Sequence, residues 1–341
     1  MKIASVIILN WNGKKYLEEF LPTLILHTPE WARIVVADNG STDDSLNFLC
    51  SEYPAVKIIS FEKNYGFAEG YNRAMGGIET KYSVLINSDV EVRGGWLEPL
   101  IELLESDKNI AAVMPKVLSF NERDKFEYAG ACGGFIDRLG YPFCRGRILD
   151  TVEKDHGQYD EIMEVFWATG ACFAVRTRYF NETGGFDPLF FAHQEEIDLC
   201  WRLKLTGYKI FVEPSSVVYH VGGGTLSSES PHKLFLNFRN NLAMLYKNLP
   251  KSKLGLILFI RMILDGFTAI VYLFHGNPKN FTAVFRAHID FYRMLPELRR
   301  KRRQIQKTKL RKEATLIYRG SILFQYYSGL KTFSALKNKF K

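Results

Sequence analysis

The first hundred residues alternate between short apolar runs and longer amphipathic stretches, and this alternation limits the chain to few folds. Apolar runs of strand length occupy residues 4–10, 32–38, 56–61 and 82–86, and each gap between them holds a segment of helical character. Strands that are apolar along their whole length are buried on both faces, and strands separated by helices pair in parallel. We therefore predict an α/β fold with a doubly wound, mostly parallel sheet flanked by helices.

The helices between these strands are expected at residues 13–28, 41–53 and 66–78, the second beginning with Ser, Thr and Asp residues that favour helix caps. Residues 112–175 are more irregular and rich in β-forming residues, with a loop expected at 129–142. A further buried strand at 164–176 closes this region. A loop, a helix, a strand and a glycine-rich segment follow.

Charge is distributed very unevenly along the chain. Residues 1–250 hold 25 Lys and Arg against 33 Asp and Glu, whereas residues 251–341 hold 20 against 4. A basic tail of this kind indicates an anionic partner, either a membrane or a nucleic acid. The five cysteines form no CxxC pair and the N-terminus lacks the pattern of a signal peptide, so reduced thiols and a cytoplasmic location are expected.

Polar residues follow the expected strands at four places. Asn-Trp-Asn-Gly stands at 10–13, Asp-Asn-Gly-Ser at 38–41, Asn-Tyr-Gly-Phe at 64–67 and Asn-Ser-Asp at 87–89. Turn formation explains any one of these segments. Because the carboxyl ends of parallel strands meet at one edge of the sheet, four such segments together predict a ligand crevice.

The segments exclude two common kinds of nucleotide site. No G-x-G-x-x-G follows the first strand, and no G-x-x-x-x-G-K-[ST] occurs anywhere, so neither a dinucleotide cofactor nor a P-loop is predicted. Asp89 and Glu91 instead offer carboxylates for a divalent cation, Mg²⁺ or Mn²⁺, that would neutralise a diphosphate.

A second acidic cluster, "HQEEIDLCWR", spans residues 193–202. Acidic residues at a helix start are commonly explained by the helix dipole. Beside a cleft, however, mutual repulsion among Glu195, Glu196 and Asp198 would raise the pKa of one carboxyl and make it a general base. Arg202 lies one helical turn after Asp198 and is placed to orient it.

His220 ends an apolar run and precedes Gly222–Gly224. A lone histidine is more often structural than a metal ligand. Glycines permit close approach of the backbone to a ligand, and a neutral imidazole binds Mn²⁺ well. Both interpretations of His220 stay open on this evidence.

Together these segments resemble the inverting family 2 glycosyltransferases with the GT-A fold, in particular the rhamnosyltransferase-like branch, over residues 3–245. The resemblance rests on these motifs, which keep the family's order and spacing: "SVIILNWNG", "VVADNGSTDDS", "NYGFAEGYNRAM", "LINSDVEV", "WATGACFAVR", "GGFDPLFFAHQEEIDLCWRL" and "YHVGGGT". It implies a nucleotide-sugar donor bound by the following residues: Asn10 and Asn12 in the nucleotide pocket, Asp38 at the base, and Asn64, Gly66, Ala68, Asn72 and Asn87 along the ribose, diphosphate and sugar.

The resemblance also implies roles for the acidic residues and the histidine. Asp89 would hold the metal as the last residue of a DXD-type motif, with His220 as a second ligand and Glu91 as a further candidate. Glu196 occupies the position of the catalytic base, and Glu195 is the alternative.

The implied function is metal-dependent, inverting transfer of a sugar from dTDP-rhamnose or a UDP-hexose to a lipid-linked saccharide in cell-surface polysaccharide assembly. The catalytic domain would span residues 1–250, with a nucleotide-binding half at 1–110 and an acceptor half at 111–250. A sugar-nucleotide pyrophosphorylase is disfavoured because "NWNGKKYL" is not its Gly-, Arg- and Lys-bearing loop. A catalytically silent sugar-nucleotide-binding protein is suggested only by Asn87 in place of an acid.

Residues 251–341 are predicted to form a helical, basic extension. The apolar stretch 254–274 has the length of a transmembrane helix, but Arg261 and Asp265 are costly inside a bilayer and are spaced to pair on one face. A helix in the membrane interface, or packed on the catalytic domain, is therefore favoured over a true span. Nine basic residues within 299–312, and an apolar segment at 321–330, favour an anionic membrane surface over nucleic acid. We expect a peripheral protein at the cytoplasmic face of the inner membrane, and formation of a homo-oligomer is left open.

Overall fold

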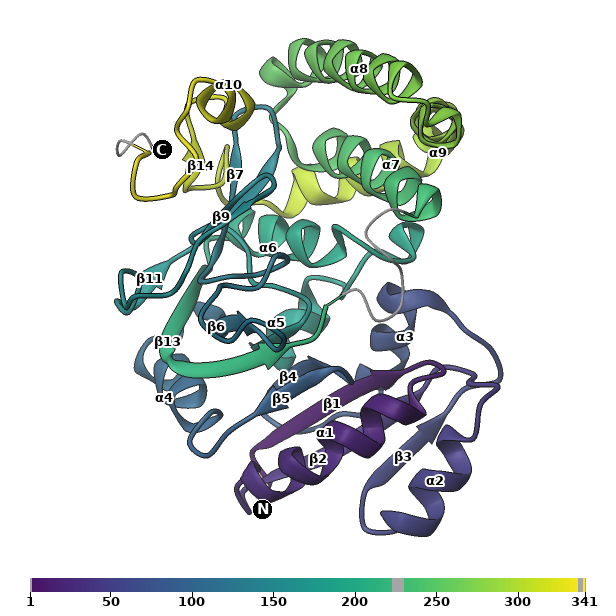
Figure 1. The fold of residues 1–341 in the computed structure, drawn as a ribbon, viewed down its shortest axis with the longest axis vertical. Helices are drawn as coiled ribbons and strands as arrows, with labels where there is room; N and C mark the ends of the chain where they lie inside the picture. Colours follow the sequence, from purple (N-terminus) through teal and green to yellow (C-terminus); the bar gives the residue numbers. More distant parts are fainter. Residues whose placement is uncertain (1, 223–229, 337–339, 341) are drawn as a thin grey trace.

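The computed structural model describes residues 2–222, 230–336 and 340, and a nine-stranded mixed sheet forms its centre (Figure 1). The strand order is β11-β13-β6-β12-β4-β1-β2-β3, and β5 pairs with β13 beside this path. The strands are β1 (Ala4–Asn10), β2 (Ala32–Asp38), β3 (Lys57–Ser60), β4 (Tyr82–Asn87), β5 (Val90–Val92), β6 (Ile110–Ser119), β11 (Met163–Glu164), β12 (Cys172–Arg176) and β13 (Lys209–His220). Strands β1 to β4 pair in parallel, which confirms the predicted α/β fold.

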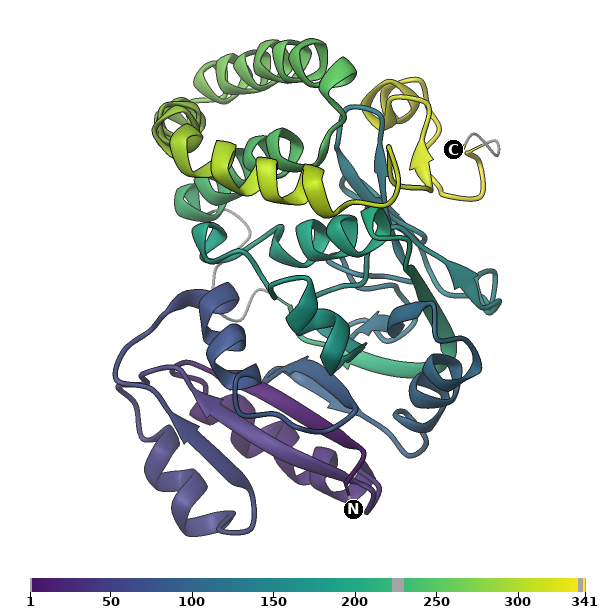
Figure 2. The ribbon, with the colours of Figure 1, turned by 180° about the vertical axis from the view of Figure 1, so that it is seen from behind.

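Helices cover both faces of this sheet (Figures 1 and 2). Right-handed crossovers place α1 and α2 on one face and α3 on the other, where α3 packs on β1 and β2. The helices of the first 205 residues are α1 (Lys14–His27), α2 (Ser45–Glu52), α3 (Gly66–Met75), α4 (Glu98–Ser106), α5 (Thr177–Glu182), the 3₁₀ helix η1 (Pro188–Phe190) and α6 (Glu195–Leu205). Helix α2 begins later than expected because Ser41 and Thr42 bond to the end of β1 instead of capping it.

A second sheet of five strands corrects the expectation of a loop at 129–142. Its order is β10-β9-β8-β7-β14. The strands are β7 (Gly134–Asp137), β8 (Pro142–Cys144), β9 (Arg147–Ile148), β10 (Thr151–Val152) and β14 (Ile317–Tyr318). Strand β7 lies inside the expected loop and pairs with β14 from the C-terminal segment. Local sequence gives no sign of a partner 180 residues away, which is why the strand was missed.

The C-terminal helices lie at the far end of the molecule from β3, where α7 packs against α6 (Figure 1). They are α7 (Pro231–Asn248), α8 (Lys251–Phe274), α9 (Pro278–Thr308) and α10 (Ile322–Tyr327). In the described part of the chain, α8 is the one helix long and apolar enough to cross a membrane. The two charged residues within its apolar stretch nevertheless face inward, since Arg261 is 3% and Asp265 1% exposed, and they pair over 3.4 Å as predicted.

The face of α8 opposite Arg261 and Asp265 is apolar and has no partner among the described residues. Phe259 and Phe267 on this face are 63% and 62% exposed. Helix α8 therefore packs on the protein with one side and presents a row of large apolar side chains on the other.

Candidate active site

Polar side chains join the carboxyl ends of β1 and β2, as the sequence predicts. Buried Asn10 donates through Nδ2 to Asp38 Oδ2 over 3.0 Å. Asn12 adopts a left-handed backbone with φ of 51°, and its Oδ1 accepts from the Thr42 N–H over 2.7 Å. Ser41 Oγ accepts from the Asn12 N–H over 2.9 Å. These bonds fix the loops after both strands in one arrangement.

One acceptor in this arrangement is unused. Asn10 Oδ1 is buried and has no hydrogen-bond partner in the described part of the chain. A Cβ placed on Gly13 would collide with it. Because a buried acceptor without a donor is costly, Asn10 Oδ1 and the space beside Gly13 suit a hydrogen-bonding ligand.

Asn39, a residue without a predicted role, joins the segment after β3 to the loops after β1 and β2. Asn39 Nδ2 donates to Asn64 Oδ1 over 3.0 Å, and its Oδ1 accepts from the Tyr65 N–H over 3.0 Å. Asn64 Oδ1 also accepts from the Gly66 N–H over 2.7 Å. The position of Asn39 directly after Asp38, at a strand end, was the signal that could have found it.

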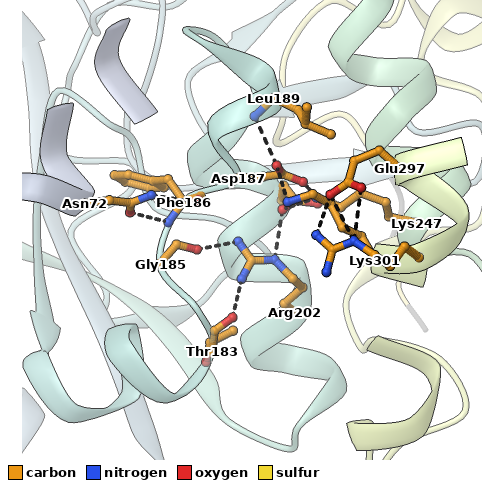
Figure 3. Close-up of polar contacts among 12 residues, drawn as sticks. Asn72, Thr183, Gly185, Phe186, Asp187, Leu189, Arg202, Lys247, Glu297 and Lys301 are labelled. Carbon is orange, nitrogen blue, oxygen red and sulfur yellow. Dashed lines mark hydrogen bonds and ion pairs between the residues drawn. The ribbon is translucent and has the colours of Figure 1, made fainter. Parts of the chain in front are cut away.

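The start of α3 contacts the loop that precedes α6. The Ala68 N–H donates to the Phe191 carbonyl over 3.1 Å, and a Cβ on Gly66, whose φ is 79°, would come within 2.5 Å of the Phe191 ring. Asn72 forms two 2.9 Å hydrogen bonds with the backbone of Phe186 (Figure 3). The structure thus uses the Ala68 amide and the Asn72 side chain to hold the loop before α6.

Asp89 and His220 meet at the junction of β4, β5 and β13. His220 Nε2 lies 3.2 Å from Asp89 Oδ1, and both residues are buried. Asn87 Nδ2 lies 3.5 Å from the same nitrogen. Glu127 Oε1 lies 3.4 Å from His220 Nδ1 on the opposite side of the ring. Glu127 was missed, because nothing in its local sequence links it to a residue 93 positions later. Gly223 and Gly224 of the "YHVGGGT" motif lie outside the described residues.

The Asp89–His220 pair fits a divalent cation. Two ligands at right angles and about 2.1 Å from one ion lie about 3 Å apart, close to the observed 3.2 Å. Burial opposes a charge on His220, but Asp89 and Glu127 outweigh it and raise the pKa of His220 to about 10. The carboxylates therefore stabilise positive charge here, and Glu127 is placed to orient the ring. The described residues contain no cluster of three or more His, Cys, Asp or Glu ligands, so substrate oxygens and water would complete the coordination.

Glu91 is not brought to this pair. Its carboxylate forms two hydrogen bonds with Arg123, of 2.9 and 2.7 Å, and these bonds lower the pKa of Glu91. Val90 and Val92 on either side are buried. Across β5 and β13, His220 pairs with Val90, whereas Glu91 pairs with Tyr219. Because side chains alternate along a strand, Glu91 points to the face opposite His220, which corrects the expectation of a third ligand.

A turn with strained backbone geometry directly precedes α6 and its acidic residues. Phe191, His193 and Gln194 all have left-handed backbones, with φ of 61°, 69° and 73°. Such strain in residues other than glycine persists only where the surroundings impose it, and it is concentrated at functional sites. Here Asn240 of α7 imposes it, because its Nδ2 donates to three carbonyls of residues 190–193 over 2.8–2.9 Å.

Glu195 and Glu196 follow this turn in the first turn of α6. One carboxyl oxygen of each is buried and has no hydrogen-bond partner among the described residues. Burial raises the pKa of Glu196 to about 7, against the lowering effect of backbone N–H groups. Burial, and then repulsion from Glu196, raises the pKa of Glu195 well above its usual range. Glu196 can therefore exchange a proton near neutrality, as a general base must.

Residues 170–171 lie between Glu196 and the end of β4, the strand that precedes Asp89. The Asn87 N–H donates to the Ala171 carbonyl over 2.9 Å. A Cβ on the adjacent Gly170 would lie 3.9 Å from Glu196 Cδ. The end of β4 and the Glu196 carboxyl therefore flank one short segment.

Asp198 lies outside the site and belongs to a buried ionic network with Arg202 and Lys247, two residues that Figure 3 labels. Its Oδ2 accepts from Arg202 and Lys247, both over 2.9 Å, and its Oδ1 accepts from Asn248 over 2.8 Å. Lys247 also pairs with Asp187. The predicted Asp198–Arg202 pair is present, but both carboxylate oxygens are occupied and unavailable for chemistry.

Known structures share the fold of this chain. Staphylococcus aureus TarS 1–349 has a TM-score of 0.54 and 18% identity, covering 96% of this chain and 92% of that one. GalNAc-T7 with UDP, GalNAc and Mn²⁺ has a TM-score of 0.56 and 18% identity, covering 72% of this chain and 48% of that one. This chain thus spans about half of GalNAc-T7. The fold is that of the GT-A glycosyltransferases.

Residues 5–183 match glycosyl transferase family 2, and the chain belongs to that family. A curated relative is the N-acetylglucosaminyl-diphospho-decaprenol L-rhamnosyltransferase of Mycobacterium tuberculosis, 25% identical over 249 residues, which are 67% of this chain and 80% of the relative. Rhamnosyltransferase WbbL of Escherichia coli is 25% identical over 227 residues, 64% of this chain and 83% of the relative. The rhamnosyltransferase-like resemblance is confirmed.

Proposed function

We propose that this protein transfers a sugar, with inversion, from a nucleotide sugar to a lipid-linked saccharide during cell-surface polysaccharide assembly. The donor would be dTDP-rhamnose or a UDP-hexose. The observation that carries the proposal is the strained turn before α6, which presents Glu196, with a pKa of about 7, across residues 170–171 from Asn87 and Asp89.

In the proposed reaction, Glu196 accepts the proton of an acceptor hydroxyl as its oxygen attacks the anomeric carbon of the donor. The bond from that carbon to the diphosphate oxygen breaks, and the nucleoside diphosphate leaves. Asn10, Asn12 and Asp38 would hold the nucleotide. When bound, Mn²⁺ or Mg²⁺ would supply positive charge to the leaving diphosphate, held by Asp89 and His220.

The acceptor and location are supported by different observations. The mycobacterial relative is named for a decaprenol-diphosphate acceptor, and α8 exposes a row of apolar side chains. We infer that α8 lies on the cytoplasmic face of the inner membrane, where the basic residues of 299–312 meet anionic lipids.

The test is a panel of nucleotide sugars incubated with purified protein and Mn²⁺ or Mg²⁺, with release of nucleoside diphosphate as the signal. Turnover of one donor that is lost with EDTA, with Glu196→Gln and with Asp89→Ala would support the proposal. Thermal-shift binding is measured on the same plate. Binding of a donor without turnover, even with polyprenyl-diphosphate-linked saccharides present, would favour a silent binding protein. No binding of any nucleotide sugar would refute the proposal.

A further inference from the structure

A small cavity lies between α7 and α9, which pack side by side (Figure 2). Its volume is about 250 Å³, and it is lined by Phe235 of α7 and by Arg286, Ile289, Asp290 and Arg293 of α9. The volume corresponds to about eight water molecules at roughly 30 Å³ each. A diphosphate group is of a size to enter it.

The cavity carries unbalanced positive charge. Asp290 is already neutralised by Arg239, whose Nη1 lies 3.2 Å from Asp290 Oδ2. Arg286 and Arg293 are exposed, and neither forms an ion pair with any residue that the structure describes. They lie seven positions apart, on one face of α9. Two guanidinium groups on one cavity match the charge and the bidentate geometry of phosphate oxygens.

The cavity is linked through α7 to the loop that precedes α6. Arg239, which pairs with the cavity residue Asp290, also donates to the Leu189 and Phe190 carbonyls over 3.0 and 3.2 Å. The next residue, Asn240, holds the turn that leads to Glu196. The charged cavity and the catalytic turn are therefore adjacent to the same part of α7.

On its other side the cavity meets exposed apolar surface. Ile289 lines the cavity and lies on one helical face with exposed Phe285 and Tyr292. Tyr292 Oη donates to Met262 Sδ of α8 over 3.2 Å, so this face continues onto α8. A charged pocket bordered by a long apolar surface matches a molecule with an anionic head and a hydrocarbon chain.

We propose that Arg286 and Arg293 bind the diphosphate of the lipid-linked acceptor, with its polyprenyl chain along the apolar faces of α8 and α9. The saccharide then points toward Glu196. This proposal rests on the proposed function for the acceptor class, but it concerns a binding site that donor chemistry does not require.

The experiment measures binding of the full-length protein to phosphatidylcholine vesicles of two kinds. One kind contains a polyprenyl diphosphate and the other contains phosphatidylglycerol, in amounts that give both the same negative charge. Wild-type protein should bind the polyprenyl diphosphate vesicles more tightly. The double variant Arg286→Gln/Arg293→Gln should lose this preference by about tenfold or more, since two charge-assisted contacts are removed. A matched control, Arg299→Gln/Arg303→Gln, removes the same charge from exposed positions of α9 outside the cavity and should keep the preference.

Equal binding of wild-type protein to both vesicles, or equal loss in both double variants, would overturn the proposal and leave nonspecific lipid electrostatics. Donor turnover in the nucleotide-sugar panel is measured separately on each variant. Turnover without vesicle preference sinks this proposal and leaves the proposed function standing. Vesicle preference without turnover of any donor would support this proposal and count against the proposed function. The failure of one proposal can therefore be told from the failure of the other.

Discussion

Two neighbouring carboxyls, Glu195 and Glu196, have different properties because their surroundings differ. Glu195 is almost fully buried, whereas Glu196 is partly exposed beside Gly170. Burial, and then repulsion from Glu196, raises the pKa of Glu195 well above its usual range, whereas burial raises the pKa of Glu196 to about 7. Asp198, two residues later, is charge-paired and structural. Burial thus assigns different roles to three acidic residues that the sequence places in one cluster.

At the residue scale, Glu196→Gln should reduce turnover by about 10²- to 10⁴-fold, the usual contribution of a general base. Donor affinity should change little, because the amide keeps the shape of the side chain. Initial rates and donor binding by calorimetry check this. The comparison variant is Glu195→Gln, which keeps the shape of that side chain and should lose far less activity; a larger loss in that variant would make Glu195 the base.

The pKa of Glu196 also predicts a pH profile. Because the base must be deprotonated, kcat/KM should rise with pH through about 7 and then level off. Rates measured across this range with a saturating metal ion check the expectation. A profile already flat between pH 5 and 8 would contradict it.

The same shift has a consequence for stability. The pKa of Glu196 is higher in the folded protein than its unfolded value of 4.5. The contribution of this carboxyl to the free energy of unfolding therefore falls as pH rises from 4.5 to about 7. Glu196→Gln removes this loss and should raise the free energy of unfolding at pH 8 by on the order of 1–3 kcal/mol. At pH 4, where Glu196 is protonated, the two proteins should unfold alike, and chemical denaturation at both pH values tests this.

At the scale of elements, α7 supports the strained turn before α6. Asn240 holds the carbonyls of residues 190–193, and its neighbour Asn241 donates to Gln194 Oε1 over 3.1 Å. Arg261 of α8 donates in turn to Asn241 Oδ1. The strain before α6 is thus balanced by polar groups from two C-terminal helices.

Removal of this support should affect both stability and rate. Asn240→Ala leaves buried carbonyls without donors and should lower the free energy of unfolding by about 2–4 kcal/mol. It should also lower kcat more than donor affinity, because the Glu196 backbone is no longer held. Asn47→Ala, at an exposed helical position, should change stability by less than about 0.5 kcal/mol. Stability of the two variants is compared by melting curves, and their rates are measured at a temperature where both are folded. An unaffected kcat in Asn240→Ala would count against a role of α7 in positioning Glu196.

At the scale of the whole molecule, the C-terminal segment is joined to the rest by packing as well as by chain. Strand β14 extends the second sheet, and Phe333 packs on Phe135 with ring centroids 5.2 Å apart. Arg302 of the basic stretch donates to the Tyr246 carbonyl over 2.6 Å. Contact of α8 with a membrane would therefore place the active site at a fixed distance and orientation from the lipid surface.

The exposed face of α8 gives a test of this placement. Phe267→Glu should reduce binding to anionic vesicles by about tenfold, since burial of a phenylalanine contributes roughly 1.5–3 kcal/mol. Ile162→Glu makes a similar change at a side chain that is 52% exposed but distant in sequence from α8, and it should leave vesicle binding nearly unchanged. Flotation of both variants is compared with wild type, and equal effects would remove α8 from the membrane contact.

The sequence by itself determined the order and type of the first seven elements, because strands buried on both faces and the helices between them follow from local patterns of apolar residues. It also determined that Asn10, Asp38 and Asp89 gather at one edge, because strand ends of a parallel sheet must converge. Only the tertiary structure placed Glu127 against His220, Asn240 under the strained turn before α6, and β14 beside β7. These contacts join residues 47 to about 180 positions apart. Local sequence patterns do not indicate which distant residue will contact a given side chain, so such contacts are decided by tertiary packing.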